Sequence, residues 1–155
     1  MGYFKEQEYE FVKRTKIIIE QYDQFQIQDK EKYEVTLLLN CLVGLLILPQ
    51  QHWIRKLHGQ LDLEKDWGIT SEHIQFIEGN ANSVKDISTH IRNSISHYRF
   101  VVINNNKDID SIEFKDQDRF GNLTFMAIIS IANLRIFSLK LVDRFLSEMA
   151  KEKSY

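Results

Sequence analysis

The stretch of sequence that decides the fold is residues 83–97, SVKDISTHIRNSISH. Its apolar side chains return after three or four positions, which is the spacing of one face of an α-helix. These side chains belong to Val84, Ile87, Ile91 and Ile95. Ser83, directly before them, is a residue type that favours the N-cap. The stretch therefore predicts a helix that runs from Ser83 to about His97 and turns one side toward an apolar core.

Two segments before this stretch also show helical spacing. Over residues 4–25 the predicted buried stripe recurs every seven positions, and Ile19 and Tyr22 lie on the same side. The stripe consists of Phe4, Phe11, Ile18 and Phe25. Residues 33–48 are apolar nearly all round until Pro49, the only proline, ends them. At ~1.5 Å per residue the apolar part spans roughly 21 Å, short of the ~30 Å core of a membrane, so it predicts a central helix of a soluble bundle.

The C-terminal part of the chain predicts a last long helix over residues 122–149. Its apolar residues fall on two sides of the helix, whereas a helical bundle buries one such face internally. We therefore expect a second copy of the chain to cover part of the other face, in a symmetric homodimer.

Two short runs between the third and last helices favour strands. Residues 100–103 and 109–114 are rich in β-branched and aromatic side chains, and the NNNKD sequence at 104–108 favours a turn. This pattern predicts a β-hairpin. Residues 50–80 show no sustained period and predict an irregular region with a short helix near 70–78.

Together these elements predict a mainly α fold, a four-helix bundle with a short β-hairpin between the third and last long helices. The 155 residues, 43% of them hydrophobic, suit a single domain over 1–155 with one core. The 20 Lys and Arg against 22 Asp and Glu exclude nucleic-acid binding driven by bulk charge. Because Cys41 is the only cysteine and the N-terminus lacks a signal-peptide pattern, we expect a cytoplasmic protein.

The helix at 83–97 also carries a cluster of polar residues. At ~100° per residue, four of them fall within an arc of about 60°, some 130° from the isoleucine stripe. They are Asp86, His90, Asn93 and His97. Arg92 lies about 140° from His97, so in a regular helix the two flank the exposed side. They could meet only if the helix loosens near its end or if a second chain completes the site.

The end of this helix, Arg92-Asn93-Ser94-Ile95-Ser96-His97, contains an Arg, four intervening residues and a His, with a polar residue after the Arg. In this it resembles the HEPN family (higher eukaryote and prokaryote nucleotide-binding domains), whose mark is an Arg, four to six residues, then a His. With residues 34–42, EVTLLLNCL, the chain looks most like a group of stand-alone bacterial HEPN proteins. The resemblance covers about residues 4–149 and implies a HEPN-like bundle.

The resemblance implies metal-independent cleavage of RNA at a homodimer interface, with Arg92 and His97 as catalytic residues, Asn93 assisting and no cofactor. An imidazole with a pKa near ~6.5 can take the proton of the attacking 2′-OH or protonate the leaving 5′ oxygen. A guanidinium suits the charge of the phosphorane. Asn93 would hold the imidazole or a 2′-OH. Similar bacterial proteins are commonly toxins or phage-defence factors, which implies an antitoxin or other regulatory protein as a partner.

Four further residues are expected to support this site: Asp86, His90 and Ser96 on the same helix, and Asn40 on the preceding one. Asn40 belongs to a stripe of polar and small residues that continues through Thr36 and Gly44. We expect Asn40 to be buried and hydrogen-bonded, either to a neighbouring backbone or beneath the catalytic histidine.

Three other interpretations of the polar cluster remain open. Asp86, His90 and His97 are metal-ligand types, although the spacing of the histidines exceeds the i, i+4 pair that grips one ion. The domain could instead be a catalytically inactive HEPN module that binds nucleotide, RNA or a protein partner. A third interpretation makes His97 a structural cap at the end of its helix.

Three aromatic residues are candidates for stacking on RNA bases. They are Trp53, Trp67 and Tyr98. Aromatic side chains in a chain this hydrophobic are more often part of the core, so the sequence leaves stacking and packing as alternatives.

Overall fold

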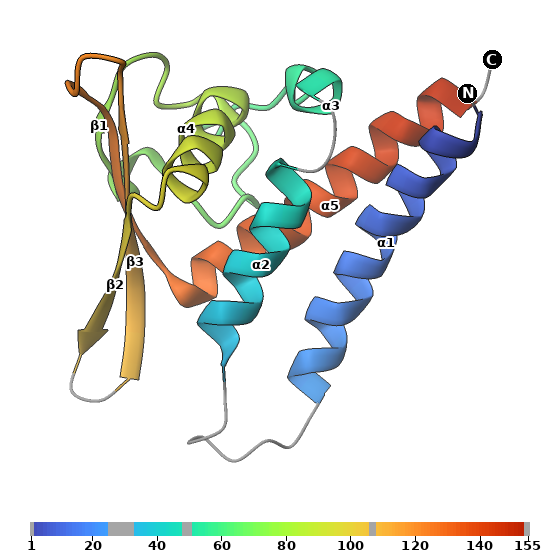
Figure 1. The fold of residues 1–155 in the computed structure, drawn as a ribbon, viewed down its shortest axis with the longest axis horizontal. Helices are drawn as coiled ribbons and strands as arrows, with labels where there is room; N and C mark the ends of the chain where they lie inside the picture. Colours follow the sequence, from blue (N-terminus) through green and yellow to red (C-terminus); the bar gives the residue numbers. More distant parts are fainter. Residues whose placement is uncertain (1, 25–32, 48–50, 106–107, 154–155) are drawn as a thin grey trace.

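The computed structural model describes residues 2–24, 33–47, 51–105 and 108–153. A four-stranded antiparallel sheet lies on one side of a central helix, and a layer of helices lies on the other side (Figure 1). In chain order the elements are α1 (Gly2–Gln24), α2 (Glu34–Leu46), α3 (Gln51–Arg55), the 3₁₀ turn η2 (Ser71–His73), β1 (Ile74–Ile77), α4 (Val84–Ser96), β2 (Phe100–Asn105), β3 (Asp108–Gln117), β4 (Leu123–Ser130) and α5 (Ile131–Lys153). The fold is therefore mixed α/β and mostly helical, rather than a pure helical bundle with a hairpin.

Helix α4 confirms the prediction for residues 83–97. The Ser83 side chain accepts a hydrogen bond from the backbone N–H of Asp86 at 3.2 Å and so caps the helix. All four residues of the apolar stripe are buried. The helix packs against α2 on one side and β3 on the other, which places it at the centre of the domain.

The prediction of one helix over 122–149 is wrong for its first part, because residues Leu123–Ser130 form β4. This strand lies inside the sheet, whose order is β1-β4-β3-β2. Its side chains at Phe125, Ala127 and Ile129 are fully buried, and this alternation with period two is that of a strand. Hydrogen bonding to a strand on each side outweighs the helical spacing that the same residues also show.

The predicted hairpin is confirmed and belongs to this larger sheet. Strands β2 and β3 pair antiparallel with Phe100 opposite Phe114, and the predicted turn includes residues 106–107, which lie outside the described residues. The prediction of a short helix near 70–78 holds only for the 3₁₀ turn η2 at residues 71–73. It is wrong for residues 74–77, which form β1 and pair with β4. The β-branched Ile74 and Ile77 and the aromatic Phe76 suit this sheet edge.

Helix α1 forms where it was predicted, but its buried face differs. Phe11 and Ile18 are 40% and 49% exposed, whereas Val12 and Thr15 are buried. Ile19, also predicted on the buried side, is confirmed as buried. The apolar side of α1 is broad, and packing along α5 and α2 selects the line of residues next to the predicted stripe. The side chains of Phe4 and Phe25 lie outside the described residues.

Helix α5 buries both of its apolar faces within one chain. It contacts α1 and α2 on one side and strands β3 and β4 on the other. Its buried residues include Leu134, Phe137, Leu141, Val142, Phe145 and Met149. No second copy is therefore needed to cover either face of this helix in its described residues, and the homodimer stays a prediction. In the described part of the chain, no helix combines the length and the apolar character that a membrane crossing requires.

Gly68 offers a stability test of the close packing on α5. It has a φ of +74°, and a Cβ there would lie 2.7 Å from Ile136 Cβ and 2.8 Å from the Asn133 carbonyl oxygen. Gly121, with a φ of +84°, has nothing within 4 Å of its would-be Cβ. Gly121→Ala should cost about 1–2 kcal/mol of unfolding free energy for the left-handed backbone alone. Gly68→Ala should cost roughly 1–3 kcal/mol more, because α5 or the loop must move. If urea unfolding shows the same loss of unfolding free energy for both variants, the close contact between Gly68 and α5 is contradicted.

Candidate functional site

The RNSISH run ends α4 in a well-formed C-terminal cap. The backbone N–H of Tyr98 donates to the Ile95 carbonyl at 3.1 Å, and that of Arg99 donates to the Ser94 carbonyl at 2.7 Å. With His97 as the C-cap, this pair of bonds is a Schellman motif. The motif needs a left-handed residue at the next position, and Tyr98 supplies it with a φ of +55°.

Tyr98 is an unusual residue for this position. Glycine is the common choice, and an L-residue in the left-handed conformation costs roughly 1–2 kcal/mol. The Tyr98 side chain is 82% exposed, so little burial offsets this strain. Among the described residues, its ring contacts that of Phe100, at 4.9 Å between centroids.

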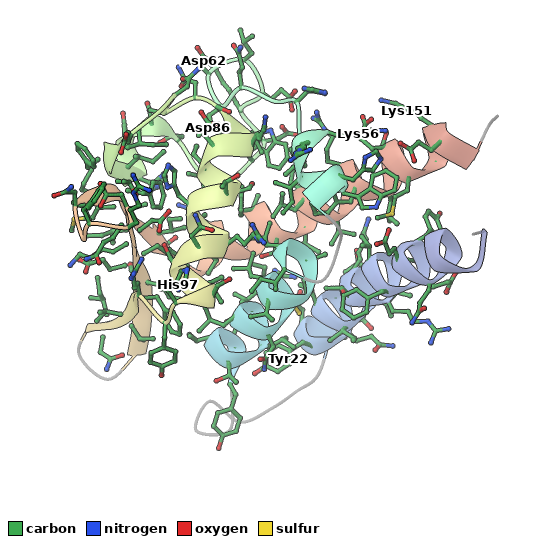
Figure 2. The ribbon with its side chains drawn as sticks, turned by 45° about the horizontal axis from the view of Figure 1, so that its top comes forward. Tyr22, Lys56, Asp62, Asp86, His97 and Lys151 are labelled. Atoms are coloured by element: carbon green, nitrogen blue, oxygen red, sulfur yellow. The ribbon has the colours of Figure 1, made fainter. Side chains whose placement is uncertain are left out.

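Arg92 and His97 lie on the two flanks of α4. The helix is regular as far as Ser96, so the two side chains project about 140° apart. Arg92 is half-buried, and its Nε has no hydrogen-bond partner among the described residues. The His97 side chain is exposed at the C-terminal end of the helix (Figure 2). A single chain thus presents the two groups separately, the imidazole exposed and the guanidinium Nε buried.

The polar cluster on α4 is organised by Asp116, a residue that the sequence reasoning missed. Asp116 lies on β3 and is only 4% exposed. The Asn93 amide donates to its Oδ2 at 3.0 Å, and His90 Nδ1 lies 2.9 Å from the same oxygen. Its Oδ1 accepts from the Gln117 backbone N–H at 2.8 Å and lies 3.7 Å from Arg99 Nη1. One buried carboxylate therefore joins α4 to the sheet.

These contacts change the expected roles of Asn93 and His90. The Asn93 amide points to Asp116 rather than to His97, so it fixes the helix that carries the motif. His90 stacks on Phe125 with ring centroids 5.0 Å apart and planes 1° from parallel. A sequence signal for Asp116 did exist, because it is in phase with the buried Ile112 and Phe114 of the same strand.

One of the other supporting residues also differs from expectation. Asn40 is exposed, so the prediction of a buried, hydrogen-bonded Asn40 is wrong. Helix α2 turns its apolar residues toward α1, α4 and α5 and leaves Asn40 and Thr36 on the solvent side. Gly44 of the same stripe does allow close approach, since a Cβ there would lie 2.8 Å from Phe11 Cζ. Ser96 is exposed beside the C-cap.

The three residues considered as metal ligands do not gather. Asp86 and His97 lie at opposite ends of α4 (Figure 2), and Asp86 Oδ2 accepts the backbone N–H of Asn80 at 3.2 Å. Within the described ranges, no three His, Cys, Asp or Glu side chains are placed to hold a metal ion together. Burial raises the pKa of the Cys41 thiol to about 11, so at neutral pH it stays protonated and unreactive.

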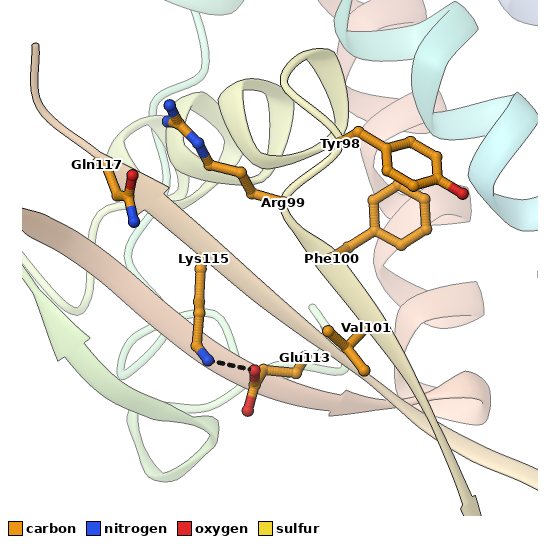
Figure 3. Close-up of a pocket in the computed structure, with 7 residues that line it drawn as sticks. All are labelled: Tyr98, Arg99, Phe100, Val101, Glu113, Lys115 and Gln117. Atoms are coloured by element: carbon orange, nitrogen blue, oxygen red, sulfur yellow. Dashed lines mark ion pairs between the residues drawn. The ribbon is translucent and has the colours of Figure 1, made fainter. Parts of the chain in front are cut away.

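A shallow pocket of about 220 Å³ opens next to the C-cap of α4 (Figure 3). Its lining comes from the chain after the cap, from β2 and from the outward side of β3. The residues are Tyr98, Arg99, Phe100, Val101, Glu113, Lys115 and Gln117. Two of them are cations, and Lys115 Nζ forms an ion pair with Glu113 Oε1 at 2.7 Å. His97 directly precedes Tyr98 in the chain, so the pocket with its aromatic and charged walls begins one residue after the motif.

The model of the family described as HEPN pEK499 p136 matches residues 1–152, nearly the whole chain. No curated protein and no solved structure matches the chain.

Proposed function

Because this chain belongs to the HEPN pEK499 p136 family, we propose that it is an endoribonuclease that cleaves RNA without a metal, at an interface between two copies of the chain. The observation that carries the proposal is the exposure and the hydrogen bonding of the two motif residues, Arg92 and His97. Arg92 has a buried Nε without a partner, and His97 is exposed on the same helix. In the described part of the chain neither the Arg92 Nε nor the His97 ring has a hydrogen-bond partner, which supports a phosphate contact for the guanidinium and proton transfer for the exposed imidazole.

The proposed reaction needs only these two groups. The 2′-oxygen of RNA forms a bond to the adjacent phosphorus, and the bond from phosphorus to the 5′ oxygen breaks. His97 performs one of the two proton transfers, taking the proton of the 2′-OH or giving one to the departing 5′ oxygen, and water performs the other, while Arg92 balances the charge of the phosphorane. The products are a 5′ fragment with a 2′,3′-cyclic phosphate and a 3′ fragment with a 5′-hydroxyl.

The separation of Arg92 and His97 supports a site built from two chains. They project from opposite flanks of α4, so one chain does not aim both at the same phosphate. In a homodimer with two-fold symmetry, Arg92 of one copy faces His97 of the other, and the symmetry repeats the pair. The dimer proposal rests on this geometry and on the family, not on an uncovered face of α5.

The biological role that suits such an activity is a toxin or a phage-defence factor held in check by an antitoxin or another regulatory protein. An RNase with an open site would damage the cell that makes it, so control by a partner is a natural part of the proposal. A catalytically inactive module that binds RNA, nucleotide or protein is the alternative that cleavage assays distinguish.

Mixing two inactive variants tests the shared site. Arg92→Ala keeps His97, and His97→Ala keeps Arg92, so a mixed dimer holds one intact pair. Random pairing makes half of the dimers mixed, and the mixture should recover about a quarter of the wild-type cleavage rate. The variants would be co-expressed with different tags and assayed on single-stranded RNA. As a control, the double variant Arg92→Ala/His97→Ala co-expressed with either single variant should recover nothing. A mixture as inactive as its components would show that the two residues act within one chain.

A further inference from the structure

Tyr98 combines three features that packing does not explain. It takes a left-handed backbone conformation that glycine adopts more easily. Its ring is exposed, whereas the other two stacking candidates, Trp53 and Trp67, are buried in the core. It also directly follows His97. The Schellman cap accounts for the left-handed backbone but not for an exposed tyrosine in place of glycine. Because such strain clusters at functional sites, this tyrosine points to a ligand.

The pocket beside Tyr98 shows what kind of ligand fits. Figure 3 shows the rings of Tyr98 and Phe100 on one side of the pocket, and Arg99, Gln117 and Lys115 on the other, with Lys115 paired to Glu113. At about 220 Å³ it is smaller than the roughly 300–1,000 Å³ of pockets that enclose a drug-sized ligand, so it suits one nucleotide unit of a longer chain. Aromatic faces next to cations are the combination that binds single-stranded nucleic acid.

We propose that Tyr98 is a stacking platform for a base of single-stranded RNA next to the scissile phosphate. The pocket holds the adjoining nucleotide, with Arg99 and Lys115 near its phosphate. The choice of RNA and of the scissile phosphate rests on the proposed function. The strained backbone presents the ring to solvent beside His97, so a base stacked on Tyr98 brings the neighbouring phosphate to the imidazole.

The test measures RNA affinity and stability in the same variants. In a His97→Ala background, which leaves the RNA uncut, Tyr98→Gly should weaken the Kd for a short single-stranded RNA by about 5- to 150-fold, the range expected for losing one stacked base. Its Tm should stay at the parent value or rise, because glycine relieves the left-handed strain. Tyr98→Trp should keep the affinity. Fluorescence of 2-aminopurine at the stacked position should be quenched by the parent and not by Tyr98→Gly.

Phe120 provides a matched control. It is also an exposed aromatic residue next to an arginine, with the Arg119 guanidinium 4.7 Å from its ring, but it lies on the β3–β4 turn. Phe120→Ala should leave the Kd unchanged. An unchanged Kd in Tyr98→Gly, or a Tm that falls by several degrees together with the affinity, would overturn the proposal.

The same experiment separates this inference from the proposed nuclease activity. If the wild-type chain binds RNA through Tyr98 but does not cleave it, the stacking site is supported and the proposed nuclease activity is wrong. If the wild type and Tyr98→Gly both cleave RNA with the same KM, the nuclease activity is supported and the stacking proposal is wrong.

Discussion

Replacing His97 or Arg92 with alanine is expected to lower the rate of RNA cleavage by a hundredfold or more. A positioned acid or base contributes ~10² to 10⁴ to a rate, and a preorganised charge at the phosphorane contributes about as much. The Tm of both variants should stay near the wild-type value, because the His97 side chain is exposed and Arg92 Nε has no partner to lose. Rates on a labelled single-stranded RNA and thermal unfolding of the same samples provide the measurement.

Matched controls exist elsewhere in the chain. Arg55 and His58 are also exposed, and their alanine variants should cleave at the wild-type rate. If both motif variants fail to fold, the pair has a structural role and the catalytic assignment is wrong.

The products and requirements of the reaction provide a second check on the same prediction. Cleavage should survive EDTA, and the 5′ fragment should carry a 2′,3′-cyclic phosphate. A 2′-deoxy nucleotide at the cleaved position should block the reaction, and DNA should remain uncut, because the nucleophile is the 2′-OH. Activity that EDTA removes and Mn²⁺ or Zn²⁺ restores would indicate a metal enzyme. Tight RNA binding without cleavage would indicate a binding module.

Asp116→Ala is expected to lower the free energy of unfolding by about 3–5 kcal/mol, the cost of removing one partner from a buried charged network. The variant leaves His90 and the Asn93 amide without their acceptor, and it removes the carboxylate that joins α4 to β3. Asp116→Asn keeps the shape and one carbonyl oxygen, so its loss should be smaller. Urea unfolding of the two variants measures the difference.

Glu113 on the same strand is the control for this variant. It faces the opposite side of the sheet and forms an ion pair with Lys115, whose side chain is 42% exposed. Because the Glu113 side chain is 17% exposed and its pair only partly solvated, Glu113→Ala should cost about 1 kcal/mol, well below the loss expected at Asp116. If Asp116→Ala is as mild as Glu113→Ala, the buried carboxylate does not hold α4 to the sheet.

Sequence patterns predicted the parts of this protein that depend on local chemistry. The stripe in 83–97 and the cap at Ser83 gave the position of α4, because helix spacing and capping involve residues within a turn of one another. The same spacing showed that Arg92 and His97 flank the helix. The β2–β3 hairpin followed from two β-prone runs around a turn.

Only the tertiary structure decided the features that depend on distant partners. Residues 123–130 carry apolar spacing that suits a helix as well as a strand, and pairing with β1 and β3 settles which one forms. The exposure of Asn40 depends on which side of α2 meets its neighbours. Asp116 reaches His90 and Asn93 only because β3 packs on α4, more than 20 residues away in sequence. Periodicity identifies an apolar face. Elements far apart in the chain decide which contact covers that face and which charged group is buried in the contact.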